Sequence, residues 1–160
     1  MLVFLDTEFT DSLNCDLISI AMVRQDGQGE LYLERSDYEA DWCNGFVRAA
    51  VLPQLGAAGP AVTQQQLADR LATWFAMLPG PVTVASDSFT DWELLLDAVG
   101  YERPANLGGH LDLRHAAASP IFSRAVVRYH EDEGPWHHAL HDARALRQGW
   151  LAWSEAHQGE

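Results

Sequence analysis

Two acidic residues follow directly on an apolar run near the start of the chain. Residues 2–9 read Leu-Val-Phe-Leu-Asp-Thr-Glu-Phe, and their apolar beginning predicts a buried β-strand. Residues two apart on a strand project from the same face, so Asp6 and Glu8 would point the same way. Burying unpaired carboxylates is very costly, so the pair needs a cation or exposure at a strand end. The alternative is that the strand ends at Leu5 and both acids lie in a turn.

The remaining hydrophobic pattern predicts strands and helices that alternate along the chain. We expect strands at 17–24, 29–33, 81–86 and 111–113, helices at 42–50, 63–78, 91–99, 120–128 and 137–157, and a loop at 56–60. The Asp26-Gly27 pair indicates a hairpin between the second and third strands. Thr63 is suited to begin a helix and Gly100 to end one. This order predicts one α/β domain, residues 1–160, with a mixed five-stranded sheet between two layers of helices.

The charge and the choice of basic residues restrict the function classes. The net charge is −13, and all ten basic residues are arginine, because the chain contains no lysine. Phosphate-binding P-loops and covalent lysine chemistry are therefore excluded. The chain also lacks the basic character of most nucleic-acid binders. If it handles phosphates, a divalent metal must supply much of the positive charge.

The two cysteines and the apolar runs carry less information. Cys15 and Cys43 have no metal-ligand spacing and form no disulfide framework, so we expect two reduced thiols. The apolar runs are too short and too often interrupted by charges to span a membrane. Acidic residues also interrupt the first run too early for a signal peptide, so we expect a cytoplasmic protein.

Two later segments place acidic residues or histidines beside predicted helix starts. Asp91 follows a buried strand, in a stretch where it and Asp87 are also suited to be N-cap or first-turn residues. Residues 137–142 read His-His-Ala-Leu-His-Asp, and histidine is the natural proton acceptor near neutral pH. Taken alone, this cluster also fits a solvated helix start. A zinc site is disfavoured, because no other segment supplies His or Cys at suitable spacing.

The order of these segments resembles the DEDD family of 3′–5′ exonucleases, in the branch with a histidine in its last motif. The matching stretches are residues 5–9 (LDTEF), 87–91 (DSFTD) and 137–142, where four residues separate His137 from Asp142. They extend over nearly the whole chain. The DTEF start, with LISIA and VLP further along, is similar to a small bacterial and phage subgroup of exoribonuclease-like members.

The resemblance implies an RNase H-like fold and phosphodiester hydrolysis assisted by two divalent cations, Mg²⁺ or Mn²⁺. The expected metal ligands are four carboxylates: Asp6, Glu8, Asp91 and Asp142. Asp6 would contact both ions, and His137 would take the proton from the attacking water. The residues expected to contact the substrate are Thr7, Phe9, Thr10, Phe89 and Trp92.

The implied substrate is the 3′ end of RNA or DNA, released one nucleoside 5′-monophosphate at a time. The negative charge disfavours steering toward long nucleic acids, so single-stranded, overhanging or short substrates are expected. Arg144 and Arg147 are candidate phosphate contacts, and a homodimer is implied because relatives are often dimers. Two departures from the family stand out: Phe9-Thr10 replaces the usual Thr-Gly, and Asp87 stands where many relatives carry Asn.

Three competing interpretations remain at this point. A phosphatase with Asp6 as its nucleophile would also begin with a strand that ends in acids, but it needs a lysine that this chain lacks. A catalytically inactive interaction module with the same fold would have no reason to bind two divalent ions. An endonuclease on the same core would release internal fragments instead of mononucleotides.

Overall fold

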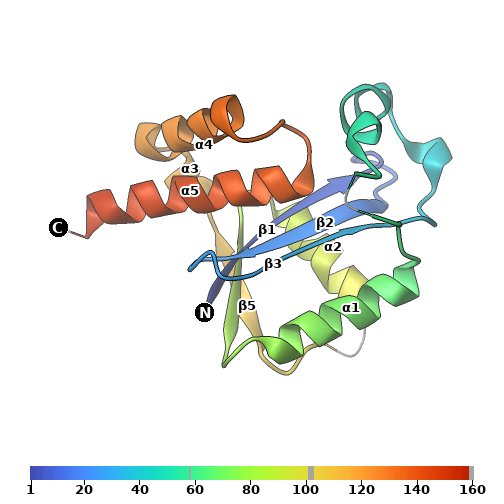
Figure 1. The fold of residues 1–160 in the computed structure, drawn as a ribbon, viewed down its shortest axis with the longest axis horizontal. Coiled ribbons are helices and arrows are strands. Elements are labelled where there is room, and N and C mark those ends of the chain that lie inside the picture. Colours follow the sequence, from blue (N-terminus) through green and yellow to red (C-terminus); the bar gives the residue numbers. More distant parts are fainter. Residues whose placement is uncertain (58, 101–102, 159–160) are drawn as a thin grey trace.

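Five strands form one mixed sheet in the order β3-β2-β1-β4-β5 (Figure 1). The structure is a computed structural model that describes residues 1–160 apart from 58, 101–102 and 159–160. The strands are β1 Leu2–Phe9, β2 Leu17–Arg24, β3 Glu30–Glu34, β4 Val82–Ser86 and β5 Leu107–Asp112. The central strand β1 is therefore the one that carries the first two acids.

The sheet combines an antiparallel meander with a parallel half. β1 pairs antiparallel with β2, where Asp6 lies opposite Ala21, and β2 pairs antiparallel with β3. Gly27 in the β2–β3 turn has φ 73°, a conformation that favours glycine. β4 pairs parallel with both β1 and β5. The mixed five-stranded sheet expected from the sequence is thus confirmed.

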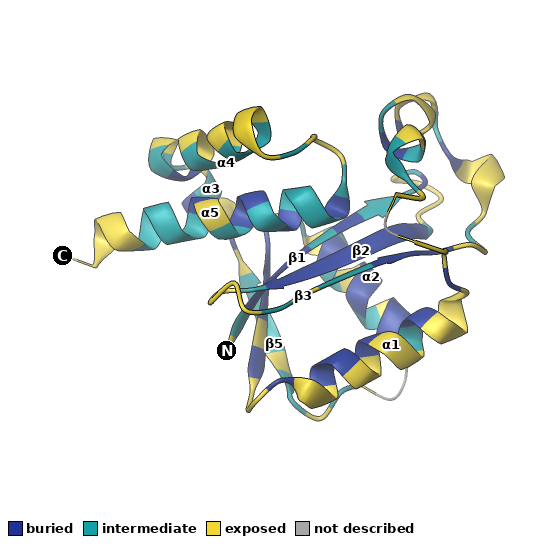
Figure 2. Ribbon diagram, viewed as in Figure 1, coloured by how far each residue is buried: buried dark blue, intermediate teal, exposed yellow. Residues whose placement is uncertain are grey.

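Helices cover both faces of the sheet, as the sequence predicted (Figure 1). They are α1 Gln64–Met77, α2 Phe89–Val99, α3 Arg114–Ala117, α4 Pro120–Asp132 and α5 Ala139–His157, with short helical turns η1 Ala40–Trp42, η2 Val47–Val51 and η3 Leu52–Gln54. On one face, Leu5 of β1 packs in a core with Leu71 of α1 and Leu95 of α2. On the other, Phe4 packs with Leu146 of α5. Figure 2 shows that the helix sides turned toward the sheet are the buried ones.

Helices α4 and α5 pack closely against each other, and a glycine makes this possible. A Cβ on Gly149 would lie 2.7 Å from the nearest ring carbon of Phe122 on α4. A side chain at position 149 would therefore displace the Phe122 ring or separate the two helices. This packing matters for the site, because α4 and α5 carry residues that face the acidic end of β1.

Most predicted boundaries agree with the structure to within two residues. The strand expected at 111–113 is β5 Leu107–Asp112, so it begins four residues earlier. Three helical segments also differ in ways that bear on the site. The helix expected at 42–50 is a series of short turns that continues through Pro53, which lies early in η3, where its missing N–H is tolerated. Helix α4 extends to Asp132 instead of ending at 128. Helix α5 begins at Ala139, so His137 precedes it. Of the loop expected at 56–60, residue 58 lies outside the described residues.

Two predictions about where helices begin and end are also confirmed. Thr63 caps α1 in a reciprocal arrangement: its hydroxyl accepts from the N–H of Gln66, whose side chain accepts from the N–H of Thr63. Gly100 ends α2 with φ 66°. Among the described residues, no helix combines the length and apolar character needed to cross a membrane.

Candidate active site

The central strand presents its two acids toward the helical layer that contains α5. β1 continues to Phe9, so the alternative in which the strand ends at Leu5 is wrong. Because side chains alternate on a strand, Asp6 and Glu8 share the face of Phe4, and Thr7 lies on the opposite face with Leu5. Asp6 and Glu8 are both half-buried. Two carboxylates thus lie side by side in the middle of the fold.

Asp87 and Asp91 reach the same place from the end of β4. Ser88, and neither acid, is the N-cap residue of α2, and Asp91 lies in the first turn of that helix. The side chain of Asp91 is buried, with 3% of the residue exposed, whereas Asp87 is exposed. The Thr7 hydroxyl donates to Asp91 Oδ1 over 2.6 Å. The hydrogen bond fixes the Asp91 carboxylate against β1.

Asp142 enters from the first turn of α5. The backbone N–H of His138, the N-cap residue, donates to Asp142 Oδ2 over 3.0 Å. His130 Nε2 lies 3.1 Å from Asp142 Oδ1. His137 precedes the helix with φ 63°, a backbone conformation that is uncommon for a residue with a side chain. The Gln54 amide donates to the carbonyl oxygens of both Trp136 and His137, which holds this turn in place.

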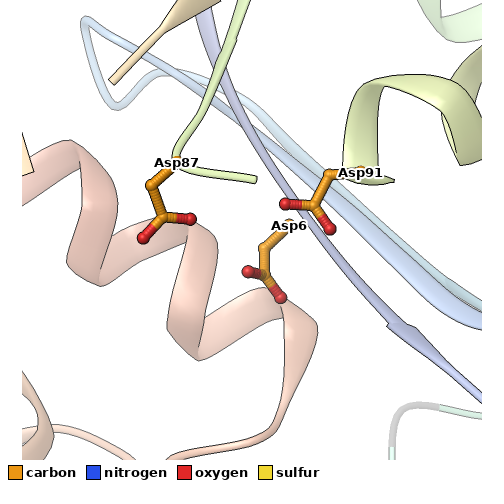
Figure 3. Close-up of side chains that lie close together, drawn as sticks. All are labelled: Asp6, Asp87 and Asp91. Carbon is orange, nitrogen blue, oxygen red and sulfur yellow. The ribbon is translucent and has the colours of Figure 1, made fainter. Parts of the chain in front are cut away.

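The carboxylates form two groups that share one member. Asp6, Asp87 and Asp91 offer ligand atoms that all lie within 4.8 Å of one another, and so do Asp6, Glu8 and Asp142. Figure 3 shows the first group, with Asp87 and Asp91 on either side of Asp6. Both groups line one pocket of about 350 Å³. Asp6 is therefore placed to contact two ions, one in each group.

The electrostatics of this pocket are unfavourable without a cation. Burial, then the charges of Asp91 and Asp142, raise the pKa of Asp6 well above its usual range. Burial, then the charges of Asp142 and Asp91, raise the pKa of Glu8 to about 8. Burial raises the pKa of Asp91 to about 7, against the Thr7 hydrogen bond, and burial also raises the pKa of Asp142. A hard divalent cation prefers oxygen ligands and would relieve this repulsion, so the donor set fits Mg²⁺ or Mn²⁺.

Two of the residues expected to contact substrate line the pocket, and three do not. Thr7 and Phe9 line it. Thr10 is buried outside it, where its hydroxyl donates to the Asn14 carbonyl over 2.6 Å. Phe89 and Trp92 also lie outside it. They pack against the His110 ring, with centroid distances of 5.9 Å and 5.3 Å.

The two arginines considered as phosphate contacts are engaged elsewhere. Arg144 forms an ion pair with Glu30 on β3. Arg147 donates to the Gln25 carbonyl over 2.8 Å and lies against the β2–β3 turn. Among the described residues, the lining of the acidic pocket contains no arginine. Cys15 and Cys43 are free thiols, as expected.

Two residues of the pocket had no signal in the sequence. His130 and Trp136 both line it, and their rings stack with centroids 3.8 Å apart. His130 lies beyond the predicted end of its helix and outside the three motifs, so no spacing argument pointed to it. Its position depends on the packing of α4 against α5, which a single sequence does not reveal.

Comparisons with known proteins support the fold but assign no role to any residue of this site. No protein-family model matches the sequence, and no curated protein matches it. Among solved structures, a moderately thermophilic exonuclease I from Methylocaldum szegediense superposes with a TM-score of 0.57 at 16% identity, covering 99% of this chain and 41% of that one. Escherichia coli exonuclease I, crystallised in complex with a dT13 oligonucleotide, gives a TM-score of 0.50 at 14% identity, covering 97% and 40%.

These likenesses establish a shared fold. The mixed sheet with helices on both faces is the RNase H-like fold of the exonuclease I structures. The chain spans about two-fifths of the length of each neighbour. At such low identity, no residue role passes from those proteins to this one.

Proposed function

We propose that this chain is a metal-dependent 3′–5′ exonuclease domain, residues 1–160, that hydrolyses the terminal phosphodiester bond of RNA or DNA. The observation that carries the proposal is the pair of carboxylate groups that share Asp6. One carboxylate cluster is common on protein surfaces, but two clusters with a common member, in one pocket beside a histidine, suit a two-ion phosphodiesterase site. The fold shared with exonuclease I supports the same activity.

The ligands would be the residues of the two groups. Asp6, Asp87 and Asp91 would hold one ion, and Asp6, Glu8 and Asp142 the other. When bound, the ions supply positive charge that binds the phosphate, activates water and stabilises the leaving 3′ oxygen. Thr7 holds Asp91, and the His138 backbone N–H holds Asp142, so two of the carboxylates are oriented before any substrate arrives.

His137 is the proton acceptor of this proposal. It lines the acidic pocket, and its ring contacts the edge of Phe46, with centroids 4.8 Å apart. His137 precedes α5 and is exposed, so its imidazole is accessible to water at the edge of the pocket. An imidazole nitrogen there takes the proton of the attacking water and later releases it to solvent.

The pocket favours a single unpaired nucleotide at the 3′ end. Its volume of about 350 Å³ matches the lower end of small-ligand sites. The lining includes two aromatic rings, Phe9 and the half-exposed Trp136, on which a base can stack. Since arginine is missing from the described lining, the ions and stacking would carry most of the substrate affinity. A short or single-stranded 3′ end fits this arrangement.

Digestion of end-labelled oligonucleotides tests the proposal. RNA and DNA of the same sequence, single-stranded or with a 3′ overhang, are incubated with the protein in Mg²⁺ and in Mn²⁺. We expect mononucleotides released stepwise from the 3′ end, and no products in EDTA. Asp6→Asn should abolish release, whereas Asp69→Asn, an exposed neutralisation on α1, should not. Internal fragments would indicate an endonuclease, and an inactive protein that binds no Mn²⁺ would support an interaction module.

A further inference from the structure

His130 is the most deeply buried polar side chain of the pocket for which the proposed function has no role. Its imidazole is 1% exposed, and Nε2 has no hydrogen-bond partner. That nitrogen instead faces Asp142 Oδ1 at 3.1 Å. A buried polar nitrogen without a hydrogen bond is costly, so its retention here calls for an explanation.

The orientation of the His130 ring is fixed from three sides. Nδ1 lies 3.0 Å from the carbonyl oxygen of Gly134, and because a carbonyl only accepts, Nδ1 is the donor. The indole of Trp136 stacks on one face of the ring, and the ring of Tyr129 meets it edge-on, with centroids 5.4 Å apart. These contacts leave Nε2 only one direction in which to point, toward Asp142.

The loop that supplies these contacts is itself tightly constrained. A Cβ on Gly134 would lie 1.9 Å from Nδ1 of His141, so only glycine allows the loop to approach α5 this closely. His141 is in turn held by the Tyr129 hydroxyl, 3.0 Å from the same nitrogen. The Gly134 carbonyl therefore has a defined place, and so does the ring that donates to it.

We propose that His130 is a positioning residue for Asp142. Because Nδ1 already donates to Gly134 and a carboxylate only accepts, a second ring proton must lie between Nε2 and Oδ1, so the imidazolium holds Oδ1 while the His138 N–H holds Oδ2. Each oxygen of the carboxylate then has one partner from the protein, and its plane is set before a metal binds. Residues that orient a ligating carboxylate in this way contribute about 10- to 100-fold to metal affinity. The role rests on the proposed function, in which Asp142 is a metal ligand.

The test measures Mn²⁺ affinity of the whole protein by calorimetry or electron paramagnetic resonance, without substrate. His130→Leu removes the nitrogen at similar volume and should weaken Mn²⁺ binding about 10- to 100-fold. His130→Gln keeps an N–H that reaches toward Asp142 and should stay within about threefold of wild type. The matched control is His157→Gln, on the same helix as Asp142 but exposed and outside the pocket, which should bind Mn²⁺ normally.

A double-mutant cycle separates positioning from a general structural role. In the background of Asp142→Ala, His130→Leu should cause no further loss of Mn²⁺ affinity, because its effect acts through Asp142. An equal loss in both backgrounds, or a folded His130→Leu protein with wild-type affinity, would overturn the proposal. If the leucine variant does not fold, a folded His130→Gln protein with more than about tenfold weaker binding would overturn it instead. Absence of Mn²⁺ binding by the wild-type protein would refute the metal site itself, and this role with it.

Discussion

Thr7 and Asp91 are joined by a buried hydrogen bond of 2.6 Å between residues 84 positions apart in the chain. Thr7 was expected to contact substrate, yet its hydroxyl is directed to a carboxylate of the proposed metal site. The bond links the central strand β1 to the start of α2, and it lowers the pKa of Asp91 against the larger effect of burial. Thr7 thus supports the geometry of the acidic pocket.

We therefore expect Thr7→Val to weaken the metal site. Valine keeps the shape of threonine but removes the donor, and the loss of a buried hydrogen bond to a charged group costs about 1 to 3 kcal/mol. Mn²⁺ affinity and turnover should both fall, and Thr7→Ser should restore them. Thr10→Val serves as the control, because Thr10 is also buried and its hydroxyl also donates a hydrogen bond, but it lies outside the pocket. Equal Mn²⁺ affinities for Thr7→Val and wild type would contradict this role.

The two acids that follow β4 should differ in importance. Asp91 is buried and hydrogen-bonded to Thr7, whereas Asp87 is exposed, although both lie within ligand distance of Asp6. Loss of a residue that only orients a metal ligand usually lowers activity about 10- to 100-fold. Loss of Asp91, a ligand that is already oriented, should therefore lower turnover more than about 100-fold. Asp91→Asn should thus be nearly inactive and Asp87→Asn only partly impaired. Steady-state rates in saturating Mn²⁺ would decide, and the reverse ranking would transfer the ligand role to Asp87.

The sequence predicted the fold well because its strongest signals are local. The apolar run before Asp6, the Asp26-Gly27 turn and the Thr63 cap each depend on a few neighbouring residues. Side-chain alternation along β1 likewise predicts, from the sequence alone, that Asp6 and Glu8 project from the same face of the strand. These features determine element types and their order, from which the three-layer arrangement follows.

Tertiary packing explains what the sequence could not show. His130 reaches Asp142 only because α4 lies against α5, and the aromatic residues Phe89 and Trp92 turn to His110 on β5 instead of the pocket. Proximity to a motif therefore did not guarantee a place in the site.

His137 should matter for turnover more than its two neighbouring histidines. Its φ of 63° makes alanine a poor probe, because alanine in this conformation adds strain, whereas asparagine tolerates it. His137→Asn should fold normally and lower the rate about 10²- to 10⁴-fold, the usual contribution of a general base. His138→Ala and His141→Ala should retain far more activity. A larger loss at either of them, in a protein with unchanged thermal stability, would place the base there.

The pH dependence of stability should reveal the carboxylate cluster in the metal-free protein. Folding raises the pKa of Glu8 from 4.5 to about 8 and that of Asp91 from 3.8 to about 7. The folded protein then binds more protons than the unfolded chain between these values, so stability falls as pH rises from about 4.5 to about 8. Urea unfolding in EDTA should show this decline, and saturating Mn²⁺ should largely remove it. A metal-free protein that gains stability from pH 5 to 8 would contradict the raised pKa values.

Substrate length should have little effect on binding beyond the nucleotides near the pocket. A nuclease that binds long strands through arginine or lysine gains affinity with each phosphate it neutralises, and it loses that affinity steeply with salt. This chain carries a net charge of −13, and Arg144 and Arg147 are engaged with Glu30 and Gln25. The KM for a five-nucleotide single strand should therefore lie within about threefold of that for a thirty-nucleotide strand, with a shallow dependence on KCl. A KM that falls steadily with length, and rises steeply with salt, would show a basic binding path outside the acidic pocket.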